Sequence, residues 1–135
     1  MKNSLQIGII DRRHVEWVAV FVAFSWMGEY IHNRWELPQL GILSPENSLL
    51  LLPAAGLFLL WWKAPGSRMP AVLLLVLGML HLLGGGIISV IPFKFLPYYP
   101  EQSVQHYLAH IVYGVAQLPL IIAMIRQIRQ SPRSA

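Results

Sequence analysis

Long apolar stretches alternate with short polar segments along this sequence. Four stretches stand out, and they cover approximately residues 15–32, 45–62, 70–91 and 100–125. The hydrocarbon core of a bilayer is about 30 Å thick, so a helix of roughly 17–25 residues crosses it. Residues 49–62 and 71–91 present no polar face to water, which is typical of helices in lipid. We therefore predict an all-α fold, an integral membrane bundle of four transmembrane helices that forms a single domain over residues 1–135.

The composition agrees with a membrane protein. Hydrophobic residues make up 56% of the 135 residues and charged residues only 12%, which is about half the charged fraction of an ordinary soluble domain. The net charge is +4, and in a soluble protein such a balance suggests nucleic-acid binding. Here the basic residues lie between the apolar stretches, so we expect no nucleic-acid partner. The chain has no cysteine, which excludes disulfides, thiolate metal sites and cysteine nucleophiles.

The basic residues are divided unequally between the two sides of the predicted bundle. Only Arg34 and Lys94 lie in the first and third loops. The other eight are Lys2, Arg12, Arg13, Lys63, Arg68, Arg126, Arg129 and Arg133. By the positive-inside rule, both termini are therefore predicted to be cytoplasmic, in a plasma (inner) membrane. Aromatic residues favour membrane interfaces and agree with this topology. They are Trp61 and Trp62 on the inner side and Trp35, Phe93, Phe95, Tyr98 and Tyr99 on the outer side.

Two of the predicted spans carry polar residues at steps of three and four, and this spacing places them on one helix face. The series are Ser25, Glu29, His32 and Glu36 in the first span, and His106, His110, Tyr113 and Gln117 in the fourth. The two spans run in opposite directions, so the two series can meet level by level. Glu29 and His110 would lie roughly 5–10 Å below the outer boundary. The spacing thus predicts that both polar faces point inward and meet.

The third span adds His81 near mid-membrane, with Gly85 and Ser89 on the same face. The glycines at 84–86 allow another backbone or a ligand to approach closely. The second span offers almost nothing polar, so we expect it to provide packing only; Ser44 and Pro45 suit its N-terminus. The sequence predicts a polar pocket in the outer half of the membrane. Its lining would be Ser25, Glu29, His32, His81, His106, His110, Tyr113 and Gln117.

Ionisable side chains at the centre of a bilayer cost about 2.5–3.5 kcal/mol each and usually mark a functional site. We therefore expect the pocket to bind a small amphiphilic molecule, lipid-like or quinone-like, or a metal ion. In a membrane-embedded enzyme of isomerase or proton-shuttling type, Glu29 and His110 would act as acid and base. A single metal ion would be held by Glu29, His106 and His110.

Other interpretations stay open. The spacing of Glu29 and His32 is that of carboxylate-bridged di-iron bundles, but the second motif that such sites need is missing. Haem bound between His81 and a histidine of another span is disfavoured, because His81 lies deeper than the other histidines. The polar groups could instead only fasten the helices together. The chain could also be a homo-oligomer, or an accessory subunit of a larger membrane complex.

Overall fold

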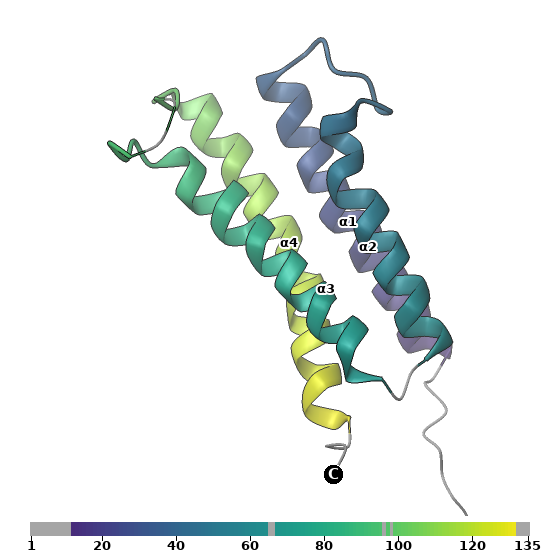
Figure 1. Cartoon of the computed structure of the whole chain (residues 1–135). Helices are drawn as coiled ribbons and strands as arrows, with labels where there is room; N and C mark the ends of the chain where they lie inside the picture. Colours follow the sequence, from purple (N-terminus) through teal and green to yellow (C-terminus); the bar gives the residue numbers. More distant parts are fainter. Residues whose placement is uncertain (1–11, 65–66, 96, 98, 132–135) are drawn as a thin grey trace, which may run out of the picture.

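The computed structural model describes residues 12–64, 67–95, 97 and 99–131, and these contain helices and no strand (Figure 1). The first two helices are α1 (Arg12–Glu36) and α2 (Pro45–Lys63). The third, α3 (Arg68–Leu80), continues into the π-helical segment η1 (His81–Ile87) and the short 3₁₀ segment η2 (Ile88–Val90). The last is α4 (Val104–Gln130). The prediction of an all-α fold with four helices is confirmed.

Two helical stretches, Arg68–Val90 and Val104–Gln130, are long and apolar enough to cross a membrane. Among the described residues, α1 and α2 do not meet the same criterion. Polar residues interrupt α1, and α2 begins and ends with polar or charged residues. The structure therefore supports two spans by length and composition.

Helix boundaries differ from the predicted ones mainly at α4. It begins at Val104, four residues after the predicted start, because the Ser103 hydroxyl caps the helix and accepts a hydrogen bond from the backbone N–H of His106 at 3.2 Å. α2 begins as predicted, with Ser44 in the extended N-cap conformation and Pro45 in the first turn. The Ser44 hydroxyl makes no capping hydrogen bond.

α4 packs against α1 on one side and against α3 and η1 on the other. The start of α1, the α2–α3 connection and the end of α4 lie at one end of the molecule (Figure 1). The segments that carry most of the basic residues are thus gathered at that end. Lys2, Arg133 and Tyr98, which entered the topology prediction, lie outside the described residues, as does the side chain of Arg12.

The interior of the bundle is apolar in one half and polar in the other. On the inward face of α1, Val18 and Val22 are buried, and the polar series that starts at Ser25 follows them at the same spacing. On α4, the polar series is followed by the buried Leu120 and Met124. The apolar half is completed by Leu50, Ala54, Trp61, Ala71, Leu74 and Ala123. One continuous face of each helix therefore changes from apolar to polar partway along its length.

Glycines bring the helices close together in the polar half. A Cβ atom added at Gly28 of α1 would overlap the Ala116 Cβ atom of α4. A Cβ atom at Gly86 would lie 3.1 Å from the Cα atom of Gly114. The predicted close approach at residues 84–86 is confirmed at Gly86 and at Gly85, whose added Cβ would overlap a tyrosine ring of α4. Small residues at such contacts are typical of helix packing in membranes.

Candidate functional site

The predicted polar residues come together in the interior of the bundle, between α1, η1 and α4. Six of them are buried: Ser25, Glu29, His106, His110, Tyr113 and Gln117. His32 and His81 are half-buried. The polar faces of α1 and α4 therefore meet as the spacing predicted. We call these eight residues the polar cluster.

The inner end of the polar cluster is closed by Gln117, which is 0% exposed. Its Oε1 atom accepts a hydrogen bond from the Ser25 hydroxyl. Its Nε2 atom donates to the carbonyl oxygens of Ser25 and Tyr113, each at 3.2 Å. These bonds join α1 to α4 and occupy both ends of the amide. Ser25 and Gln117 thus match the alternative in which polar groups fasten the helices.

His81 and Tyr113 connect η1 to α4. The His81 Nδ1 atom is hydrogen-bonded to the Tyr113 hydroxyl. The Tyr113 ring occupies the space that a side chain at Gly85 would fill. The glycine therefore allows the ring to reach His81.

His32 and His110 form the central contact of the polar cluster. Their Nε2 atoms lie 3.2 Å apart. The Nδ1 atom of His110 lies 2.6 Å from the carbonyl oxygen of Gly85, so this nitrogen carries a proton and donates. The same carbonyl oxygen, in the π-helical segment η1, also accepts a hydrogen bond from the Ser89 hydroxyl at 2.6 Å.

The proton on the outer nitrogen of His32 can also be assigned. The Gly41 carbonyl oxygen accepts from Asn47 Nδ2 at 2.7 Å, so the Oδ1 atom of Asn47 faces Asn33 and accepts from its Nδ2 at 2.9 Å. The Oδ1 atom of Asn33 then accepts from the Nδ1 atom of His32 at 3.0 Å. A neutral imidazole has only one N–H group, and in both His32 and His110 it is on Nδ1. Two bare Nε2 atoms would then face each other at 3.2 Å, so they can hydrogen-bond to each other only when one added proton lies between them.

Two buried polar atoms of the polar cluster have no hydrogen-bond partner in the described structure. The His106 Nδ1 atom lies 2.8 Å from the carboxylate of Glu36, but its Nε2 atom is unpartnered. The Oε2 atom of Glu29 is unpartnered too. Leaving such a group unsatisfied costs about 1–3 kcal/mol, and more when it is charged. These two atoms are therefore the ones to which water or a ligand would bind.

The rings form a continuous series that starts at His106, near the N-terminus of α4. His106 and His32 each lie 4.4 Å from His110 between ring centroids, and His32 lies 5.3 Å from Tyr113. Tyr113 is bonded to His81. The series is made of side chains that can take up or release a proton, as in the proton relays of membrane proteins.

The prediction that the second span provides packing only is wrong. Asn47 in the first turn of α2 is 0% exposed and bonds both Asn33 and Gly41. Its carbonyl oxygen also accepts from the Trp26 indole N–H at 2.8 Å. A single asparagine near a helix end gives no periodic signal, so the sequence pattern missed it. Asn33 was missed because it lies outside the spacing that singled out its neighbour His32.

The metal interpretations have no support in this geometry. Among the described residues, no group of three or more His, Cys, Asp or Glu side chains could hold a metal ion. The predicted set of Glu29, His106 and His110 therefore does not form such a group. His81, which was considered for haem, is bonded to Tyr113.

The two described cavities, of about 840 and 390 Å³, lie elsewhere on the molecule, and none of the eight residues of the polar cluster lines either of them. Comparisons with known protein families, curated proteins and solved structures found no match to this chain.

Proposed function

We propose that this chain is an integral membrane protein of four spans, with both termini in the cytoplasm, that binds the polar head of a small amphiphile in the polar cluster and exchanges a proton with it. The observation that carries the proposal is the contact between His32 and His110. Both outer nitrogens of this pair face oxygen atoms to which they can donate, so a hydrogen bond between the inner nitrogens requires a shared, added proton. Such a pair can release this proton and take it back without moving its rings.

The outer surface supports insertion into a membrane. Only 17% of the residues in the most apolar part of Arg68–Val90 are buried inside the bundle. Its exposed residues include Leu73, Val76, Leu80, Leu83 and Ile87. A continuous apolar surface of this kind is rare on soluble monomers but ordinary in lipid. The charge asymmetry in the sequence then favours cytoplasmic termini.

The unpartnered atoms suggest which chemistry the bound head has. The Nδ1 atom of His106 faces a carboxylate, so in the neutral ring the Nε2 atom is an acceptor. The carboxylate oxygen of Glu29 is an acceptor as well when it is ionised. Both atoms therefore favour a head that donates hydrogen bonds, such as the hydroxyl group of a quinol or a sterol. In this arrangement Glu29 accepts a hydrogen bond from the hydroxyl, whose O–H bond stays intact, and the proton that is exchanged is the one between His32 and His110.

The shared proton can be tested directly by ¹⁵N NMR on histidine-labelled protein in bilayers. We expect His32 and His110 to show protonated Nδ1 atoms together with one further proton coupled to both Nε2 atoms. Asn33→Leu removes the acceptor of His32 without touching His110, and it should return the pair to two ordinary neutral tautomers. Two neutral rings in the wild-type protein would contradict the proposal.

The binding of a hydroxyl head is tested with two probes that share one tail, decylubiquinol and decylubiquinone. We expect the wild-type protein to prefer the quinol. Glu29→Gln should weaken quinol binding about tenfold or more, because a hydrogen bond to a charged group is worth about 1.5–3 kcal/mol. Glu101→Gln is the matched control, since Glu101 is an exposed carboxylate in the α3–α4 connection. Equal binding of both probes, or equal effects of the two variants, would refute this function; a loss of folded protein in step with binding would favour the fastening alternative.

A further inference from the structure

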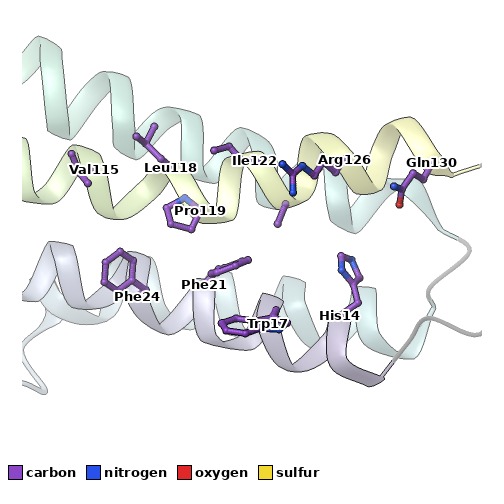
Figure 2. A pocket seen from close by; sticks show the side chains of 11 residues that line it. His14, Trp17, Phe21, Phe24, Val115, Leu118, Pro119, Ile122, Arg126 and Gln130 are labelled. Carbon is purple, nitrogen blue, oxygen red and sulfur yellow. The ribbon is translucent and has the colours of Figure 1, made fainter.

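An open groove runs between α1 and α4 in the apolar half of the bundle, away from the polar cluster. It encloses about 840 Å³. Figure 2 shows Trp17, Phe21 and Phe24 of α1 facing a row of α4 side chains across it. That row consists of Val115, Leu118, Pro119 and Ile122. His14, Arg126 and Gln130 line one end of the groove, near the end of α4 (Figure 2). We call this feature the α1–α4 groove.

The length of the groove corresponds to one leaflet of a bilayer. The apolar part of its α4 wall runs from Val115 to Ala123, about 12 Å at 1.5 Å per residue, and Arg126 and Gln130 continue the lining beyond it. The hydrocarbon core is about 30 Å thick, so one leaflet is about half of that. The walls are apolar, and the groove is open at the surface of the molecule, where Trp17 is 58% and Val115 is 55% exposed. These dimensions fit an acyl chain that lies parallel to the helices.

The charge at the end of the groove selects an anionic head. Arg126 is exposed and makes no hydrogen bond or ion pair within the described part of the chain. No Asp or Glu lines the groove. The Nε2 atom of His14 is bonded to Gln127 at 3.1 Å, so the arginine is the group left for a ligand. Guanidinium groups bind phosphate oxygens in a bidentate manner.

We infer that the α1–α4 groove binds one anionic glycerophospholipid of the cytoplasmic leaflet, with an acyl chain between the aromatic and aliphatic walls and the phosphate on Arg126. This inference rests on the membrane insertion and orientation proposed above. It does not depend on the chemistry of the polar cluster. The cytoplasmic leaflet is the one that carries anionic lipids and attracts basic side chains.

The test uses the full chain reconstituted in vesicles of equal parts phosphatidylcholine and phosphatidylglycerol, released in mild detergent and measured by native mass spectrometry. We expect one phosphatidylglycerol to be retained per chain, in preference to phosphatidylcholine. Arg126→Gln should lower this retention about fivefold, the effect of one basic residue near an anionic surface. Arg129→Gln is the matched control, because Arg129 is on the same helix but does not line the groove. Ile122→Trp should fill the groove and remove both lipids.

Three outcomes would overturn the inference. They are equal retention of the two lipids, equal effects of Arg126→Gln and Arg129→Gln, and a dimer closed over the groove. The dimer is detected by cross-linking through Ile122→Cys, which is unambiguous because the chain has no cysteine of its own. Alkaline carbonate treatment separates this inference from the proposed function. Protein that carbonate removes from the vesicles defeats both, whereas inserted protein that retains no lipid defeats the inference alone.

Discussion

The adjacent glycines of η1 allow a sharp test of the packing in the polar cluster. Gly84 and Gly85 share the same π-helical segment, but their surroundings differ. A Cβ atom added at Gly85 would overlap the Tyr113 ring, and two further atoms of that side chain would lie 3.0 Å away. A Cβ atom added at Gly84 would meet nothing within 4 Å. Gly84→Ala is therefore the matched control for Gly85→Ala.

The expected magnitudes follow from these surroundings. Tyr113 is only 5% exposed, so its ring cannot move outward to make room. Overpacking of this kind costs about 1–3 kcal/mol, and loss of the hydrogen bond to His81 adds about 0.6 kcal/mol in a membrane bundle. Replacing glycine by alanine at an unstrained helical position stabilises by about 0.4–1 kcal/mol. This gain is common to both variants and cancels, so we expect Gly85→Ala to be less stable than Gly84→Ala by about 2–3 kcal/mol.

The measurement is reversible unfolding in mixed detergent micelles, followed by circular dichroism, with both variants studied at the same protein concentration. Retention of the His81–Tyr113 bond can be followed in parallel by ¹⁵N NMR of labelled histidine. Equal stabilities of Gly84→Ala and Gly85→Ala would refute the placement of the Tyr113 ring against η1. A loss of stability in both variants would refute the assignment of open space at Gly84.

Three further predictions concern other parts of the fold. Gln117→Leu should destabilise the bundle by about 1–2 kcal/mol in the same unfolding assay. Adding Ser25→Ala should then cost little more, because Ser25 has already lost Gln117 as its hydrogen-bond partner. If the losses of stability of the two single variants add up fully in the double variant, the bond between the two side chains is contradicted. Ser103→Ala should cost about 1 kcal/mol and fray the start of α4, seen as faster amide exchange at His106; unchanged exchange would contradict the cap. With Ser67→Cys or Glu101→Cys as the only cysteine, a membrane-impermeant maleimide should reach Glu101→Cys alone from outside intact cells, and labelling of both would contradict the proposed topology.

The two halves of the bundle carry the two proposed sites, and the arrangement has a physical basis. α1 and α4 are long enough for their facing surfaces to change character partway along. In the half that contains Val18 and Leu120, apolar side chains fill the interior. The open groove lies on the exposed surface of the same two helices, α1 and α4. In the half that contains His32 and His110, the interior itself is polar.

The sequence by itself determined the features that depend on local pattern. The apolar stretches predicted four helices, because a helix needs only a run of suitable residues and end signals such as Pro45. The spacing from Ser25 to Glu36 and from His106 to Gln117 predicted the inward polar faces, because side chains three and four apart must share a helix face. Four spans that alternate in direction predicted that the start of α1 and the end of α4 lie at the same end of the bundle, and Figure 1 shows them there. The unequal distribution of Lys and Arg predicted that this end is cytoplasmic, which stays a prediction.

Only the tertiary structure decided which polar atoms meet. The hydrogen-bond partners around His32 and His110 include the Gly85 carbonyl and Asn47, which lie on other helices and have no periodic relation to either histidine. Hydrogen bonds form only at about 3 Å and depend on angle. The sequence pattern gives the level of a side chain relative to a neighbouring helix only to within a turn, so it cannot predict these bonds. The α1–α4 groove was likewise invisible in the sequence, since a groove is set by how far two helices diverge and which side chains fill the gap.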